Sequence, residues 1–395
     1  MLRTRHMTGV LTAVAALLAA AQSSAELAPL EPFQMVRSLQ LVQDRIADGD
    51  HAALPMQHKL IELIDERLRA SDREDYADGR NFRALLIYAM SGGNPRTVES
   101  IMASLSLEDT DARLATGVLE YLRGRPGEAA NALASIDPRE VASEVAAFLA
   151  LVKGSVTAND DPETSLAFLD MARVMGPGTL VEEAALRRSA MLAITQRETG
   201  RFLLASEQYV RRFLRSPYAS QFADAFVTGI AELHDTIDLE RVAETIGGMN
   251  GEQAKVIYLR LARRAAIDQH TALLAFARGG LERMAAEVGS ENDPRAILYS
   301  TVAAVTTDDV AEVRSQLESI DRRRLSAGDR MLLDAAMRIV TEVVSQPTAA
   351  AERAEEPHAR AVAAAKPASA TGDAYVDDAR KRLDQVDRLL QETGQ

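Results

Sequence analysis

Three short stretches combine residue types that carry out chemistry in other proteins. Residues 91–95 read Ser-Gly-Gly-Asn-Pro, and adjacent glycines beside a serine are typical of loops that cradle phosphate. His51 and His58 lie seven residues apart and could begin a metal site. Glu99-Ser100 places an acid beside a serine, as in the catalytic segment of some cell-wall lyases. Whether these residues have a catalytic or a purely structural role depends on the helices, strands or turns in which they lie.

The Ser-Gly-Gly-Asn-Pro stretch fits the turn of a helical hairpin better than a phosphate loop. No β-strand pattern precedes it, and the apolar residues of 82–89 follow one helical face. No Lys-Ser or Lys-Thr follows to hold phosphate and a metal ion. Gly92 or Gly93 suits the left-handed position past a helix end, Asn94 suits an N-cap and Pro95 suits the first helical turn.

The other two stretches also lack what catalysis needs. No histidine or paired carboxylate supplies a third ligand to His51 and His58, and the chain has no cysteine. Some exported peptidoglycan lyases with helical solenoids place a Gly-Leu-Met-Gln segment after their Glu-Ser pair. Here Glu99-Ser100 is followed by Ile-Met-Ala-Ser instead. With no nucleophile elbow, Walker loop or dinucleotide fingerprint, the sequence predicts no enzyme, no cofactor and no metal.

Composition narrows the classes of partner. The 395 residues carry a net charge of −13, which argues against binding to nucleic acid or anionic lipid. Aromatic residues make up only 4% of the chain and tryptophan is absent, so stacking platforms for bases or sugars are not expected. The absence of cysteine suits an oxidising compartment. These features favour a protein that binds other proteins.

Residues 1–25 have the pattern of a secretory signal. Arg3 and Arg5 precede a short apolar stretch at 10–21, and small residues lead to a cleavage site between Ala25 and Glu26. The alternative is an uncleaved anchor, but this stretch is shorter than the ~20 residues that span a bilayer. We therefore expect an exported protein with no membrane insertion after cleavage.

The rest of the chain is patterned as helices, with a repeat of 38 residues. Runs of alternating polarity, which would indicate strands, are almost absent. A turn breaker, then a small residue, then a bulky residue recur together and predict helix-turn-helix units. The breakers are Gly124, Pro162 and Gly200, the small residues are Ala129, Ala167, Ala205 and Ala243, and the bulky residues are Leu133, Met171 and Tyr209.

These units resemble tetratricopeptide repeats, best between Gly200 and Pro217. The predicted fold class is all-α: an irregular helical-hairpin, tetratricopeptide-like solenoid over residues 26–345. An ordinary all-α domain is the alternative. Residues 346–372 are rich in Ala, Pro and Glu and predict a disordered linker. Residues 373–395 then predict a C-terminal amphipathic helix.

Two amphipathic helices are candidates for partner binding. In the helix predicted near 33–45, one face is apolar, while Arg37, Gln40 and Arg45 remain for solvent or a partner. The C-terminal helix carries a coiled-coil-like seam and must dock on the body, self-associate or bind a partner. The candidate seam residues are Val376, Leu383, Val386 and Leu390.

The segments EPFQMVRSLQLVQDRIADGDHAALPMQHKLIELID and RNFRALLIYAMSGGNPRTVE resemble the MotC family, exported motility proteins of rhizobia and their relatives. The resemblance is dense over about residues 31–135. It implies a periplasmic protein of flagellar rotation and chemotaxis that binds the periplasmic part of the stator protein MotB, as a stabilising or chaperone-like partner. It implies no enzymatic activity and no cofactor, and it assigns no binding residues.

The sequence therefore predicts a periplasmic, MotB-binding accessory of the flagellar motor. The alternative is a general periplasmic scaffold or assembly factor with tetratricopeptide-like repeats, acting in secretion or in polysaccharide export.

Overall fold

The computed structural model describes residues 30–288, 293–304 and 310–345, and every regular element in these ranges is helical. The predicted all-α class is confirmed. Several predictions lie outside the described residues: the signal with its Ala25–Glu26 cleavage site, the linker 346–372 and the C-terminal helix with Val376, Leu383, Val386 and Leu390. The division at residue 345 stays a prediction.

Most of the helices in the described ranges are two to five turns long. In chain order they are α2 (Pro32–Ala47), α3 (Ala53–Arg69), η1 (Glu74–Ala77), α4 (Gly79–Met90), α5 (Pro95–Ser104), α6 (Asp109–Leu122), α7 (Pro126–Leu133), α8 (Ser143–Thr157), α9 (Pro162–Met175), α10 (Leu180–Thr195), α11 (Thr199–Arg212), α12 (Ala219–Glu232), α13 (Leu239–Gly247), α14 (Gly251–Ile267), α15 (Thr271–Val288), α16 (Pro294–Ala304), α17 (Val310–Glu318), η2 (Arg322–Arg324) and α18 (Ala327–Ser345).

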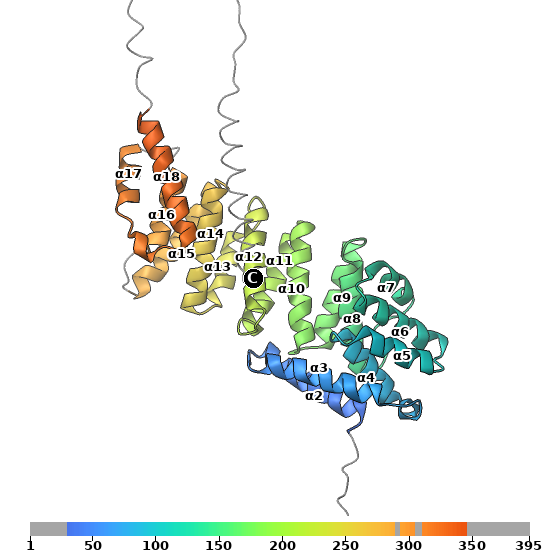
Figure 1. Cartoon of the computed structure of the whole chain (residues 1–395). Helices are drawn as coiled ribbons and strands as arrows, with labels where there is room; N and C mark the ends of the chain where they lie inside the picture. The colour runs from blue at the N-terminus through green and yellow to red at the C-terminus, as the bar shows by residue number, and fades with distance from the viewer. Residues whose placement is uncertain (1–29, 289–292, 305–309, 346–395) are drawn as a thin grey trace, which may run out of the picture. The chain divides into compact units, whose positions relative to one another are not determined.

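Successive helices form a solenoid of hairpins. The pairs α6–α7, α8–α9, α10–α11 and α14–α15 pack closely, and the first helix of each hairpin also contacts the first helix of the next, from α4 through α16. Figure 1 shows these helices following one another in chain order. Each hairpin therefore buries its apolar face against its neighbours, as repeat proteins do.

The Ser-Gly-Gly-Asn-Pro stretch ends α4 and starts α5, as predicted. Gly92 adopts the left-handed conformation at φ 89°, and its N–H donates to Ala89 O at 3.2 Å while Gly93 N–H donates to Tyr88 O at 3.1 Å. This pair of bonds is a Schellman motif. Asn94 then caps α5 by accepting the N–H of Arg96 at 3.0 Å, and Pro95 is its first helical residue. The stretch is the turn of a hairpin.

Of the three residues that the repeat predicts as turn breakers, the first two lie at helix boundaries and the third does not. Gly124 follows the end of α6 in the left-handed region, and Pro162 opens α9. Gly200, however, lies within the first turn of α11. The preceding turn is closed instead by Arg197, whose φ is 53°. A non-glycine residue in the left-handed region gives no signal in the sequence, so the pattern predicts the nearby glycine as the breaker instead.

The alanines predicted to lie between paired helices are also buried only in part. Ala129 and Ala205 are buried, but Ala167 is exposed because α9 turns Ser165, Leu166 and Leu169 inward instead. In the α6–α7 and α8–α9 hairpins the close approach comes from a glycine on the first helix. Gly154 on α8, for example, lies directly against the side chain of Leu169. In the α14–α15 hairpin the roles are reversed, because Gly280 on α15 lies against the side chain of Tyr258 on α14.

Two large apolar clusters fill the body. One runs from α2 to α8, and the other runs from α10 to α18 and includes Ala47 at the end of α2. The second contains a column of stacked rings, with the rings of Tyr209 and Phe222 4.0 Å apart between their centroids. Tyr209, predicted as a bulky repeat residue, is fully buried there. These aromatics provide much of the apolar area that the hairpins remove from water.

Candidate interaction surface on the N-terminal hairpin

The N-terminal hairpin, α2 and α3, lies across several repeats instead of stacking as one more unit. α2 contacts α4 near the start of the solenoid and α10 three hairpins later (Figure 1). The apolar side chains of its buried face include Val36, Leu39, Val42 and Ile46, and the sequence predicts such an apolar face. Because Val36 and Leu39 belong to the first large cluster and Ala47 to the second, α2 joins the two cores.

The tip of this hairpin docks on the connection between α11 and α12. The ring Nε2 of His51 lies 3.0 Å from the carbonyl oxygen of Arg215, across 164 residues of sequence. Gly49, at φ 98°, packs so closely on Arg215 that a Cβ there would collide with it. His51, a candidate metal ligand by its residue type, thus makes a structural contact.

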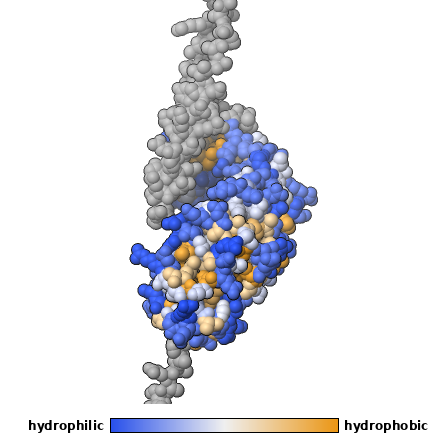
Figure 2. Space-filling model, turned by 90° about the vertical axis from the view of Figure 1, so that its right-hand side faces the viewer, coloured by the Kyte–Doolittle hydropathy of each residue, from blue (hydrophilic) through white to orange (hydrophobic). Residues whose placement is uncertain are grey.

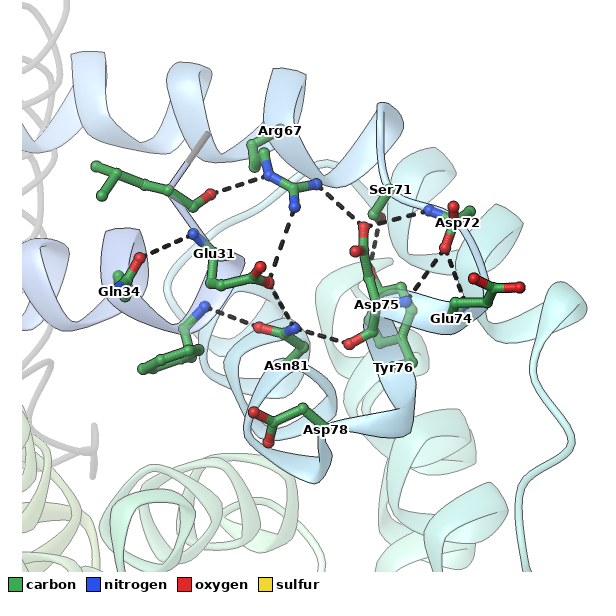
Figure 3. Close-up of polar contacts among 12 residues, drawn as sticks. Glu31, Gln34, Arg67, Ser71, Asp72, Glu74, Asp75, Tyr76, Asp78 and Asn81 are labelled. Atoms are coloured by element: carbon green, nitrogen blue, oxygen red, sulfur yellow. Dashed lines mark hydrogen bonds and ion pairs between the residues drawn. The ribbon is translucent and has the colours of Figure 1, made fainter. Parts of the chain in front are cut away.

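A polar network fixes the other end of the hairpin, where α2 begins and α3 ends (Figure 3). The Arg67 guanidinium donates to Leu30 O at 3.0 Å and to Asp75 Oδ2 at 3.2 Å, and it lies 3.9 Å from Glu31 Oε2. Its side chain is only 14% exposed, so these contacts are shielded from solvent more than a surface ion pair is. The network ties the chain before α2 to the segment after α3.

Asn81 connects this network to the first repeat. Its side chain is buried in the first turn of α4, donates to Glu31 Oε2 at 3.1 Å and to Asp75 O at 2.8 Å, and accepts the N–H of Phe33 at 3.1 Å. All the hydrogen-bonding groups of this amide but one lone pair are therefore used. Figure 3 shows Asn81 between Glu31 and Asp75. The network serves structure, since its groups face one another.

A cavity of about 470 Å³ lies between α2 and the solenoid, within the usual size range of ligand sites. The helices around it are α2, α3, α4, α8, α9 and α10. The lining residues are Arg37, Gln40, Leu41, Gln43, Asp44, Gln57, Met90, Ser91, Ser143, Glu144, Ala147, Phe148, Leu151, Met175, Gly176, Thr179, Leu180, Val181 and Ala184.

The predicted partner residues of α2 have different surroundings. Arg37 is exposed, and Gln40 is half-buried; both line the cavity. Arg45 is also exposed, but its guanidinium pairs with Asp50 at the hairpin tip. Leu41, one turn beyond Arg37, is 60% exposed. The free face of α2 thus presents a cation, an amide and an apolar side chain together, while the charge of Arg45 is already compensated.

Exposed apolar side chains extend this surface onto α3. Met56 and Leu63 are exposed there. Figure 2, which views the right-hand side of Figure 1, where α5, α6 and α7 lie, shows apolar residues grouped between hydrophilic ones on that side of the body. Grouped apolar residues on a surface are typical of protein interaction sites.

The other residues considered for catalysis or metal binding do not form a catalytic or metal site in the described ranges. Glu99 lies on α5 and pairs with Arg123 at 2.6 Å. Across the described ranges, no group of three or more His, Cys, Asp or Glu side chains could hold a metal ion. Nor does any helix among the described residues have the length and apolar character needed to cross a membrane.

Comparison with known proteins connects this scaffold to motility. The family described as "Chemotaxis protein MotC" matches residues 1–395. The curated Chemotaxis protein MotC of Rhizobium meliloti (strain 1021) is 38% identical over 320 residues, which cover 80% of this chain and 73% of that protein. This chain belongs to the MotC family. No solved structure matches it.

Membership in the MotC family places the chain among motility proteins, a family of accessory proteins and not of known enzymes. Its role in the flagellar motor is therefore one of protein–protein interaction. The matched residues include α2, α3 and the polar network that holds them.

Sequence reasoning about this MotC-family chain missed Gln43, Gln57 and Ser91, which line the cavity. Gln43 falls on the buried side of α2, and the other two lie on α3 and at the end of α4. They share no sequence pattern, because they come together only when α2 crosses the repeats.

Proposed function

We propose that this protein is a periplasmic accessory of the flagellar motor that binds and stabilises the periplasmic part of the stator protein MotB, so that the flagellum can rotate. The family match along the whole chain carries the proposal. The all-helical hairpin body supports it, because such bodies present side chains from successive helices to one partner. A partner that binds only the folded form of MotB would stabilise that form by mass action.

The proposed contact residues on the body are Arg37, Gln40 and Arg45 on α2. Arg37 is the strongest of the three, because it is exposed and in no ion pair of the described chain, whereas Arg45 is paired with Asp50. A cation beside the exposed Leu41 suits an acidic and apolar partner surface. The C-terminal seam of Val376, Leu383, Val386 and Leu390 is a second proposed contact, outside the described residues.

Export is part of the proposal. The Arg3 and Arg5 region, the apolar stretch at 10–21 and the small residues before Glu26 support a cleaved signal. N-terminal sequencing of the protein from a periplasmic fraction should read from Glu26. A product that begins at Met1, or recovery only from the cytoplasm, would show that the assignment of the signal is wrong.

The decisive test is genetic and biochemical together. A deletion strain should lose swimming, and the tagged wild-type protein should recover MotB from periplasmic extract. Arg37→Ala and Gln40→Ala together should reduce that recovery, whereas Arg211→Ala, an exposed arginine on α11, should not. Normal swimming of the deletion strain, together with no recovery of MotB, would exclude the proposal.

The alternative is a general periplasmic scaffold with tetratricopeptide-like repeats, acting in secretion or envelope polysaccharide export. The hairpin repeats themselves favour it, since they suit many partners. A deletion strain that swims normally but fails to export a polysaccharide or a secreted protein would select this function.

A further inference from the structure

The cavity beneath α2 contains polar groups that find no partner within the described chain. The side chain of Gln43 is only 6% exposed, lines the cavity and makes no hydrogen bond there. Gln57 Oε1 and Ser91 Oγ are also buried at the cavity wall without a partner. Buried polar atoms in folded proteins are hydrogen-bonded in the great majority of cases, so Gln57 Oε1 and Ser91 Oγ, together with the unpaired amide of Gln43, point to a polar ligand in this cavity.

Part of the lining is apolar and comes from the solenoid. Phe148 and Leu151 project from α8, and Leu180 begins α10; all three are half-buried at the cavity. A ligand that fills the cavity must therefore combine hydrogen-bonding groups on one side with an apolar group on the other. A peptide segment does this, because its main chain donates and accepts while a side chain can be apolar.

The charged residues of the lining restrict which peptides could bind. Arg37 and Asp44 line the cavity from α2, and neither forms an ion pair within the described chain. Glu144, the remaining charged residue of the lining, is held by Arg83 at 2.6 Å. Burial and the nearby charge of Asp48 raise the pKa of Asp44, so a cationic group beside it would relieve the cost of its ionised form.

The spacing of these two charges sets a spacing in the ligand. Seven residues of helix separate Arg37 from Asp44 by about 10 Å along the α2 axis. An extended chain advances by about 3.3 Å per residue, so the same distance corresponds to about three residues of peptide. An acidic residue opposite Arg37 would then lie about three positions from a basic residue opposite Asp44.

We propose that this cavity binds an extended peptide segment of a protein partner, in which an apolar residue lies between an acidic and a basic residue about three positions apart. The amides of Gln40, Gln43 and Gln57 hold its main chain. The apolar side chain enters the part of the cavity lined by Phe148 and Leu151. This inference goes beyond the proposed function, because it names a site and a ligand pattern that do not depend on MotB as the source.

The experiment selects peptides without prejudging their origin. A phage-displayed library of random 12-residue peptides is selected on the full mature chain and counter-selected on Ala184→Phe. Ala184 is half-buried on α10 at the cavity wall, so a phenyl ring there fills the space. Met191→Phe, on the exposed side of the same helix and outside the lining, is the matched control.

The proposal expects enriched peptides with the acid–apolar–base pattern. Their affinity should fall at least about tenfold in Ala184→Phe and in Gln43→Leu, which keeps the volume and removes the amide, and it should be unchanged in Met191→Phe. Gln43→Leu keeps the test valid if the larger substitution impairs folding. Enrichment of no peptide, or equal affinity for wild type and Gln43→Leu, would overturn the proposal.

A charge reversal tests the orientation of the peptide. Arg37→Glu should weaken the selected peptides, and replacement of their acidic residue by lysine should restore binding to that variant while weakening it to the wild type. If Arg37→Glu binds the original peptides as tightly as wild type does, the assigned charge pairing is wrong. Because MotB appears in neither arm, failure here leaves the MotB pull-down as a separate result.

Discussion

The hydroxyl of Tyr88 on α4 donates a hydrogen bond of 2.8 Å to Oδ1 of Asp65 on α3. The hydroxyl oxygen of Tyr88 in turn accepts a hydrogen bond of 2.8 Å from the N–H of Asn94. One buried phenol therefore joins the N-terminal hairpin, the first repeat and the turn that follows it. Since a buried polar group left without its partner costs more than the bond itself contributes, substitutions at this joint should be informative.

Removing the hydroxyl should destabilise the body. Tyr88→Phe leaves Asp65 with one donor fewer and the N–H of Asn94 without its acceptor, so we expect a loss of about 1–3 kcal/mol in the free energy of unfolding. Urea unfolding followed by circular dichroism measures it. Tyr121→Phe is the control: its half-buried hydroxyl makes no hydrogen bond in the described chain, and it should change stability by less than about 0.5 kcal/mol.

The same joint should make the body sensitive to acid. Burial alone would raise the pKa of Asp65, but the hydrogen bond from Tyr88 and the ion pair with Arg69 outweigh it and hold the pKa below its usual value. A carboxyl whose pKa is depressed on folding stabilises the folded state above its unfolded pKa, near 4, and loses that contribution as pH falls through its folded pKa.

Stability curves at several pH values test this sign. The difference in unfolding free energy between wild type and Asp65→Asn should be largest near neutral pH and should shrink below about pH 4. A difference that stays constant down to pH 3, or grows there, would show that Asp65 is not ionised and stabilised in the folded protein.

Gly93 should tolerate no side chain. A Cβ there would overlap the ring of Tyr88, so Gly93→Ala should cost about 1–3 kcal/mol through displacement of that ring. Gly200→Ala is the matched control, because Gly200 is exposed in a helical turn with open space around its Cα. We expect it to be neutral or stabilising by up to about 1 kcal/mol. If both variants lose a comparable free energy of unfolding, Gly200 acts as a turn breaker after all.

The repeat register is tested by two alanines that the sequence treats alike. Ala205→Leu should destabilise by about 1–3 kcal/mol, because Ala205 is buried on α11 within the second core. Ala167→Leu should change stability by less than about 0.5 kcal/mol, because Ala167 is exposed on α9. Thermal unfolding of the two variants side by side gives the answer. Equal losses of stability in the two variants would support the simple repeat of 38 residues.

Local features of the fold could be predicted from sequence because neighbouring residues determine them. The turn at Gly92, the cap at Asn94 and the helix start at Pro162 each depend on residues within a few positions. The buried face of α2 was likewise correct, since its apolar period is regular. The register failed at Arg197, where an ordinary side chain takes the conformation expected of glycine.

The candidate site could not be predicted, because it depends on which helices α2 packs against. An apolar helical face specifies that it is buried but not against which partner. The contact of His51 with Arg215 brings together residues 164 positions apart, and no pattern in one sequence marks it. Arg37 and Gln40 were identified as free polar residues, whereas the buried Gln43 was not, since a polar residue on an apolar face looks like an irregularity.

Binding of MotB is the central claim, and titration calorimetry with the purified periplasmic part of MotB tests it most directly. The mature chain should give a saturable complex with a defined stoichiometry, and Arg37→Ala should weaken it while Arg211→Ala should not. No heat of binding and no comigration in size-exclusion chromatography at tens of micromolar, with both proteins folded, would contradict the account.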